Sequence, residues 1–191
     1  MRLERNKSLL LVVDLQAGLV PVIDGGDQAV AEASWLGGVA EALDVPVWVT
    51  EQNPRGLGGS APRLLEAVPR HRLWHKVHFS AMSEPDFADA LAGSGRYQVV
   101  ICGTEAHICV LQTGLGLLEA GYEVYWLADA TASRRAEEAA LARSRMVQAG
   151  AVPVSADMAA YEWLERCDGE RFKSVHRHFL KPRAARPLRF C

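Results

Sequence analysis

The stretch YQVVICGTEAHICVLQTGLGLL at residues 97–118 runs from a strand pattern through a turn into a helix pattern. Tyr97 to Cys102 is short, apolar and rich in β-branched residues, as is typical of a strand buried in a parallel sheet. The positions after the turn that recur at helical spacing are Val110, Thr113, Leu117 and Leu118. This stretch therefore predicts one strand–turn–helix unit of an α/β protein.

The same alternation repeats along the chain. Five further runs have the length and composition of buried strands: Leu9 to Leu15, Val45 to Thr50, His71 to Val77, Tyr122 to Ala128 and Ala151 to Val154. Stretches with helical periodicity separate them. Because each right-handed crossover places its helix over one face of the sheet, we predict a three-layer α/β/α sandwich around a six-stranded parallel sheet, a Rossmann-like architecture.

The sequence also indicates where helices begin and end. A capping box is predicted at Ser83 and Asp86, and Ser155 is predicted to cap a last helix that runs toward Cys167. Two glycines stand where a left-handed residue would end a helix: Gly121 and Gly150.

Length and composition limit the class of protein. The 191 residues fit a single domain over residues 1–191, and the hydrophobic share of 49% and charged share of 23% exclude a disordered or fibrous chain. A net charge of −2 gives no overall field for holding nucleic acid or an anionic membrane. No acidic residue follows Glu170, so residues 171–191 form a basic C-terminal tail. We expect this tail to pack over a neighbouring subunit.

The compartment is predicted from what the chain lacks. No window approaches the ~18 apolar residues that a membrane span needs, and the start of the chain has no secretory pattern. We therefore expect a cytoplasmic protein. The four cysteines include no Cys-x-x-Cys pair, which favours free thiols: Cys102, Cys109, Cys167 and Cys191.

Three polar residues follow apolar strands at the edge where α/β proteins hold their active sites. Asp14 ends the first strand, Lys76 closes the third, and Cys109 follows the fourth strand near the start of the next helix. A helix N-terminus and a cation favour a thiolate, and a carboxylate can accept the thiol proton. These residues predict Cys109 as a nucleophile, Asp14 as general base and then general acid, and Lys76 as the stabilising cation.

Each of these residues also has an ordinary structural interpretation. An aspartate at a strand end is often a turn former, a lysine there is usually a solvated charge, and a cysteine near a helix start is more often a packing residue. The chain has no Gly-Lys-Ser/Thr sequence and no Gly-x-Ser-x-Gly sequence, so a P-loop and a serine-hydrolase elbow are excluded. The three residues alone leave a cysteine hydrolase and a non-catalytic binding protein open.

Three sequence motifs around these residues carry further information: LLVVDLQ at 10–16, HK at 75–76 with FS at 79–80, and GTEAHICVLQT at 103–113. Over roughly residues 9–155 the chain resembles the isochorismatase-like cysteine hydrolase family. The resemblance implies a six-stranded parallel sheet between helices and a catalytic triad of Asp14, Lys76 and Cys109. It also implies a non-proline cis peptide bond at Thr104–Glu105 that helps to shape the oxyanion hole.

The chain departs from the nicotinamidases of this family. Those enzymes carry histidines after the second strand that hold a metal ion, whereas TEQNPRGLG at 50–58 contains none. We therefore expect neither a metal ion nor a cofactor. The resemblance is greater to isochorismatase-domain proteins of undefined substrate, and it implies four pocket residues: Gln16, Gln52, Phe79 and His107. A hydrogen bond within its own turn is the alternative for His107.

The sequence predicts a metal-independent cysteine hydrolase that acts on a small amide-like C–N substrate through a cysteine thioester. The alternatives are a non-catalytic or scaffold member of the same fold, an isochorismate-type ether hydrolase, and a nucleic-acid role through the basic tail with its phenylalanines. We expect a small-molecule substrate, a homo-oligomer as the family often forms, and no membrane or nucleic-acid partner.

Overall fold

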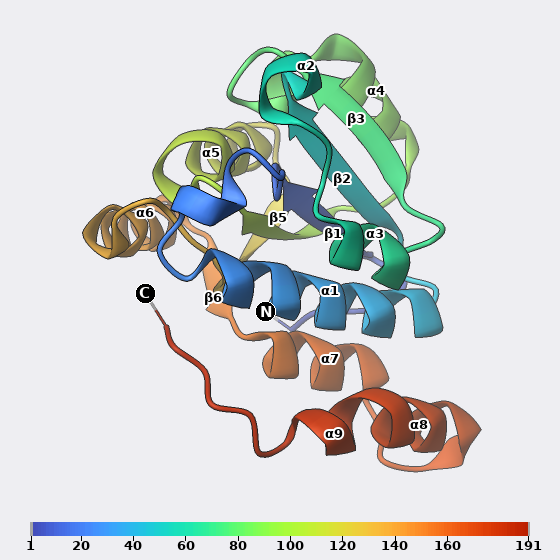
Figure 1. Ribbon diagram of the computed structural model, residues 1–191. Coiled ribbons are helices and arrows are strands. Elements are labelled where there is room, and N and C mark those ends of the chain that lie inside the picture. Colours follow the sequence, from blue (N-terminus) through green and yellow to red (C-terminus); the bar gives the residue numbers. More distant parts are fainter. Residues whose placement is uncertain (1, 191) are drawn as a thin grey trace.

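The computed structural model describes residues 2–190 and contains one six-stranded sheet (Figure 1). The strand order is β3-β2-β1-β4-β5-β6, and every neighbouring pair is parallel. The strands are β1 (Ser8–Val13), β2 (Val47–Gln52), β3 (Arg72–Lys76), β4 (Gln98–Gly103), β5 (Glu123–Thr131) and β6 (Val152–Val154). The predicted parallel α/β sandwich is confirmed.

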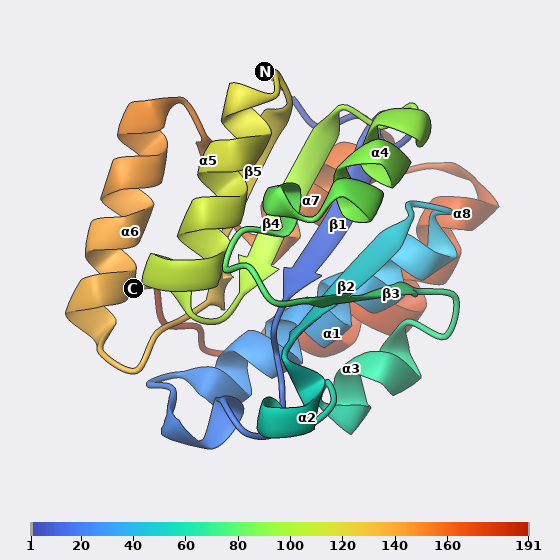
Figure 2. The same cartoon turned by 90° about the horizontal axis from the view of Figure 1, so that it is seen from above.

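Helices cover both faces of the sheet (Figure 2). The longer ones are α1 (Gly26–Ala42) and α7 (Ala156–Leu164) in one layer, and α4 (Pro85–Gly93), α5 (Leu111–Glu119) and α6 (Ala136–Ala149) in the other. In β1, Leu10 and Val12 pack in the core beneath α1, whereas Leu9, Leu11 and Val13 pack in the opposite core. Alternate residues of a strand point to opposite faces, so a strand between two layers is apolar throughout.

Shorter turns and helices complete the chain. They are η1 (Val20–Val22), α2 (Pro54–Leu57), α3 (Pro62–Ala67), η2 (Ala81–Ser83), η3 (Ala106–Val110), α8 (Gly169–Val175), η4 (His176–Leu180) and α9 (Lys181–Arg183). Both η3 and η4 are single π-helical turns, while η1 and η2 are 3₁₀ turns. Within residues 2–190, no helix has the length and apolarity that a membrane crossing requires.

The predicted helix ends are partly confirmed. The Ser155 side chain accepts a hydrogen bond from the Met158 N–H at 3.2 Å, and Gly121 and Gly150 are left-handed at φ 86° and 113°. The capping box at Ser83 is wrong, because the N-cap of α4 is Glu84. The Glu84 carboxylate does not cap the helix, since it accepts hydrogen bonds from the backbone of the segment that follows β3.

The helix that Ser155 caps is not the last helix of the chain. Helix α7 ends at Leu164, where Glu165 turns to φ 61°, and α8, η4 and α9 follow it. Arg183 is only 6% exposed. Its guanidinium pairs with two buried carboxylates of the same chain, Glu32 on α1 at 3.0 Å and Asp129 on β5 at 3.2 Å. The tail is therefore anchored in its own core; Cys191 lies outside the described residues.

Candidate active site

The crevice of the site lies at the centre of the sheet. Strands β1 and β4 are neighbours, and the helices that follow them, α1 and α5, cover opposite faces (Figure 2). In an open α/β sheet, a crevice forms at the carboxyl ends of two neighbouring strands when the helices that follow them lie on opposite faces. Asp14 follows β1 directly and Cys109 lies in η3 after β4, so both residues are placed at this crevice.

Asp14 and Lys76 form a buried ion pair. Lys76 Nζ lies 2.7 Å from Asp14 Oδ2, and the exposed fractions of the two side chains are 1% and 0%. The other carboxylate oxygen, Oδ1, accepts a hydrogen bond from Thr50 Oγ1 at 2.7 Å. Lys76 is the last residue of β3, so its side chain passes the end of β2 to reach Asp14. Loss of either partner would leave an uncompensated charge in the interior.

The Cys109 thiol lies close enough to Asp14 and Lys76 for both charges to act on its pKa. Cys109 is 6% exposed and lies one residue before the end of η3, which continues into α5. The structure thus brings together the three side chains that the strand ends indicated. Their catalytic roles remain predictions.

The protonation of the resting thiol differs from the sequence-based expectation. We expected the helix N-terminus and the nearby cation to favour the thiolate. Instead, burial, followed by the negative charge of Asp14, raises the pKa of Cys109 to about 12, and the opposing effect of Lys76 is smaller. The thiol is therefore protonated at neutral pH, and its proton must be transferred when it reacts.

The turn before Cys109 has a tightly held backbone. The peptide bond between Thr104 and Glu105 is cis, at the position that the family resemblance implied. The Thr104 hydroxyl donates to the Asp14 carbonyl oxygen at 2.7 Å, and the Thr104 N–H donates to the Val13 carbonyl oxygen at 2.9 Å. Gly103 has φ 123°, and a Cβ there would lie 1.9 Å from that same Val13 oxygen. Only glycine fits where β4 meets this turn.

The loop after β5 fixes the same turn from the other side. The buried Glu105 carboxylate accepts hydrogen bonds from Arg134 Nε at 2.9 and 3.1 Å, and the His107 ring Nδ1 lies 2.9 Å from Ser133 Oγ. The Ala106 N–H also donates to the Ala132 carbonyl oxygen. Sequence reasoning missed Ser133 and Arg134, although they follow the carboxyl end of a predicted strand, where site residues gather.

The four expected pocket residues are placed in different ways. The Gln16 side chain is fully buried and bonds to the backbone of Gln52 and Gly58, so its amide groups are used within the protein. The Gln52 side chain contacts Lys76, with Oε1 2.6 Å from Nζ. Phe79 is 53% exposed, and its carbonyl oxygen accepts from Lys76 at 3.2 Å. The His107 ring contacts Ser133 Oγ on the loop after β5, and not a group within its own turn.

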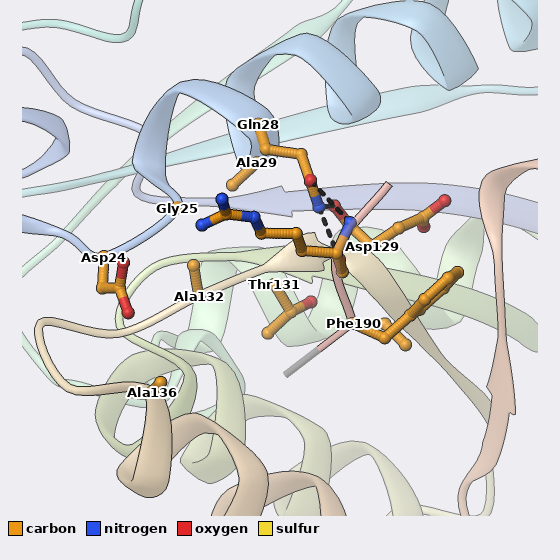
Figure 3. Close-up of a pocket in the computed structure, with 11 residues that line it drawn as sticks. Asp24, Gly25, Gln28, Ala29, Asp129, Thr131, Ala132, Ala136 and Phe190 are labelled. Atoms are coloured by element: carbon orange, nitrogen blue, oxygen red, sulfur yellow. Dashed lines mark hydrogen bonds between the residues drawn. The ribbon is translucent and has the colours of Figure 1, made fainter. Parts of the chain in front are cut away.

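A separate cavity of about 420 Å³ lies between the start of α1, the end of β5 and the C-terminal segment (Figure 3). The Gln28 carboxamide donates to the Arg189 carbonyl oxygen and accepts from the Arg189 N–H, which fixes the segment across this cavity. None of Asp14, Lys76 or Cys109 lines it. Among residues 2–190, no group of three or more His, Cys, Asp and Glu side chains is arranged to hold a metal ion.

The arrangement of the site can be compared with known proteins. Residues 8–158 match the isochorismatase domain, which is most of the chain, and the protein belongs to this family of isochorismatase-like hydrolases. Isochorismatase domain-containing protein 2 of Xenopus laevis is 30% identical over 182 residues, which cover 95% of this chain and 87% of the relative.

Solved structures agree with this assignment. The MAR1 ribonuclease of Caenorhabditis elegans is 32% identical and covers 94% of this chain and 93% of its own, with a TM-score of 0.88. The YcaC protein of Escherichia coli, described as an octameric hydrolase of unknown specificity, is 25% identical, covers 95% and 92%, and has a TM-score of 0.86. YcaC of Pseudomonas aeruginosa, solved with covalent acrylamide, is 26% identical, covers 96% and 94%, and has the same TM-score.

Proposed function

We propose that this protein is a metal-independent cysteine hydrolase of small amide-like C–N substrates. The observation that carries the proposal is the buried Asp14–Lys76 pair, whose two charges both act on the pKa of the Cys109 thiol. A nucleophile, a base and a stabilising cation close together are what acyl transfer through a thioester requires. Two YcaC relatives, one described as a hydrolase and one bearing covalent acrylamide, support a reactive site in this fold.

The first half of the reaction forms a thioester. The Asp14 carboxylate takes the thiol proton as Cys109 Sγ bonds to the carbonyl carbon, and the carbonyl oxygen becomes an oxyanion. The backbone N–H groups of Glu105 and Cys109 stabilise that charge, a contribution worth about 3–4 kcal/mol per donor in comparable enzymes, whereas the Thr104 N–H is already used by the Val13 carbonyl oxygen. When the C–N bond breaks, the protonated Asp14 donates its proton to the leaving nitrogen, so ammonia or an amine departs.

The second half consumes water. Asp14, again a carboxylate, takes a proton from a water molecule, whose oxygen attacks the thioester carbon. The C–S bond then breaks, the sulfur recovers a proton from Asp14, and the carboxylic acid is released. Lys76 keeps its charge throughout and stabilises whichever of Asp14 or Cys109 is negative.

The pairing of the nearby cations supports a substrate that is neutral at its reacting end. Lys76 is paired with Asp14, and Arg134 is paired with the buried Glu105. Cations with partners of their own are poor ligands for a substrate carboxylate. This favours an amide over an isochorismate-type ether, which carries carboxylates. Turnover of isochorismate but of no amide would reverse this preference.

Ribonuclease activity is the second candidate, because the similar C. elegans protein is described as a ribonuclease. Two exposed arginines of the C-terminal region would supply phosphate contacts: Arg171 and Arg177. Incubation with a labelled single-stranded RNA at low and at physiological salt tests it. Cleavage that persists in Cys109→Ala would assign that activity to other residues.

We also propose a homo-oligomer as the assembled form, since the E. coli YcaC relative is octameric. Light scattering coupled to size exclusion tests it. A mass of one chain at micromolar concentration would reject the oligomer.

Hydrolysis is tested with a panel of small primary amides and a coupled ammonia assay. Wild type is compared with Cys109→Ser and Cys109→Ala, and circular dichroism checks that the variants keep their fold. We expect turnover of at least one amide by the wild type and none by either variant. Full activity in a folded Cys109→Ala variant would reject the mechanism, and a folded wild type inert toward every class tested would favour the non-catalytic scaffold.

A further inference from the structure

The ammonium of Lys76 is surrounded by oxygen acceptors. The three nearest are Gln52 Oε1 at 2.6 Å, Asp14 Oδ2 at 2.7 Å and the Phe79 carbonyl oxygen at 3.2 Å, and the His78 carbonyl oxygen lies farther away at 3.5 Å. Only Asp14 carries a charge. The position of Lys76 therefore depends on neutral oxygens as well as on its ion-pair partner, and Gln52 Oε1 is the nearest of them.

The Gln52 carboxamide has one possible orientation. Its Nε2 lies 2.8 Å from the Val77 carbonyl oxygen, which can only accept, while its Oε1 faces the Lys76 ammonium, which can only donate. The backbone of Gln52 is held as well, because its N–H donates to Gln16 Oε1 at 2.7 Å and its carbonyl oxygen accepts from Gln16 Nε2 at 3.1 Å. Gln16 thus positions Gln52, and Gln52 positions Lys76.

The neutrality of Gln52 has an electrostatic consequence. With the thiol protonated, Asp14, Lys76 and Cys109 carry no net charge. A glutamate at position 52 would have nearly the same shape and would accept the same hydrogen bond, but it would add a negative charge beside Lys76. The cation would then be shared between two carboxylates, and it would stabilise a nearby thiolate less.

We propose that Gln52 is a positioning residue of this site, a neutral acceptor that holds the Lys76 ammonium between Asp14 and the Phe79 carbonyl oxygen without adding charge. The proposal rests on the proposed function, since Lys76 is the cation of that hydrolase site. It reassigns Gln52 from a substrate contact to a support of Lys76.

The test is the rate of Cys109 alkylation by iodoacetamide from pH 7 to 10.5, read by peptide mass spectrometry. Wild type is compared with Gln52→Glu, and with Gln148→Glu, which adds the same charge at an exposed position of α6. We expect Gln52→Glu to react about tenfold more slowly at every pH in this range and to regain the wild-type rate about one pH unit higher. Gln148→Glu should match the wild type.

A second variant distinguishes the loss of the hydrogen-bond acceptor from the addition of a charge. It also keeps the proposal testable if Gln52→Glu does not fold. Gln52→Met removes the nearest acceptor of the ammonium without adding charge, so Lys76 is held less firmly beside Cys109 and alkylation should fall several-fold behind the wild type. If folded variants both follow the wild-type profile, Gln52 is only a packing residue. The assay needs no substrate, so a shifted profile together with an active Cys109→Ala variant would keep this inference and reject the hydrolase.

Discussion

Lys76 Nζ lies 2.7 Å from Asp14 Oδ2 at the carboxyl edge of the sheet, and neither side chain exposes more than 1% of its surface. The two charges act on the neighbouring thiol in opposite directions: Asp14 raises the pKa of Cys109, and Lys76 lowers it. Burial adds to the effect of Asp14, so in the resting protein the thiol keeps its proton. A pair whose members oppose each other in this way can be tested by removing one member at a time.

The first prediction concerns the sign of these two effects. Asp14→Asn should increase the rate of Cys109 alkylation at pH 8 by at least about tenfold, because the thiolate then faces Lys76 without a competing carboxylate. Lys76→Met should decrease the rate by a similar factor. Hydrolysis should be lost in both variants, since one lacks the base and the other lacks the cation. The measurement is the pH profile of iodoacetamide labelling, resolved by peptide.

Cys167 provides an internal control for this experiment, because it is exposed and lies after α7. Its labelling rate should stay the same in wild type and in both variants. A change of the Cys109 rate in the same direction in both variants would contradict the opposed effects and would indicate a loss of local structure instead.

A second prediction follows from Gly103. An alanine Cβ at this position would lie 1.9 Å from the Val13 carbonyl oxygen, at a backbone φ of 123°. The contact is with backbone in two central strands, so it cannot be relieved by rotating a side chain. We expect Gly103→Ala to prevent folding to the native state, measured as loss of soluble protein and of cooperative unfolding. Gly93→Ala, where nothing lies within 4 Å of the new Cβ, should change the free energy of unfolding by less than about 1 kcal/mol. Normal folding of Gly103→Ala would contradict this prediction, because it would show that the backbones of β1 and β4 can move apart enough to accept the methyl group.

A third prediction concerns the C-terminal region. Arg183 joins α9 to buried Glu32 and Asp129, so Arg183→Met leaves two carboxylates in the core without their main cation. We expect the free energy of unfolding to fall by about 3 kcal/mol, measured by urea titration. Arg177→Met changes an exposed arginine of η4 nearby and should have an effect below about 0.5 kcal/mol. Equal effects of the two substitutions would mean that the segment is not anchored through this ion pair.

Sequence periodicity predicts the sheet well for a physical reason. Strands β1 and β4 are buried at every position, so most of their residues must be apolar, and the pattern is visible in one dimension. The strand-end rule then places Asp14, Lys76 and Cys109 at one edge, and the structure does bring them together.

What periodicity does not predict depends on contacts between distant segments. Arg183 is one cation in a basic stretch, and nothing local distinguishes it from its exposed neighbours, because its partners are 151 and 54 residues away. The support of Lys76 by Gln52 is equally distant in sequence, at 24 residues. The raised pKa of the Cys109 thiol cannot be predicted from the sequence for a related reason: the effect of burial depends on packing that a sequence pattern does not give.

The last prediction concerns pH and the pair of Glu105 with Arg134. Hydrogen bonds from the Arg134 guanidinium hold the pKa of the Glu105 carboxyl below its ordinary value of 4.5. A lowered folded-state pKa means that the folded protein binds its proton less readily than the unfolded chain does. The pair therefore contributes stability above about pH 4.5, and this contribution is lost as pH falls through the folded-state pKa.

Arg134→Met should accordingly reduce the free energy of unfolding by about 1 kcal/mol at pH 7, a modest figure because the Arg134 side chain is half exposed. The difference from wild type should shrink as the pH falls through the folded-state pKa of Glu105, because protonation then weakens the pair in the wild type as well. Urea unfolding at pH 7, 5 and 3.5 measures this, with Arg135→Met, which breaks an exposed pair with Glu138, as the matched control. A difference that stays constant with pH would show that Arg134 stabilises the protein through packing alone.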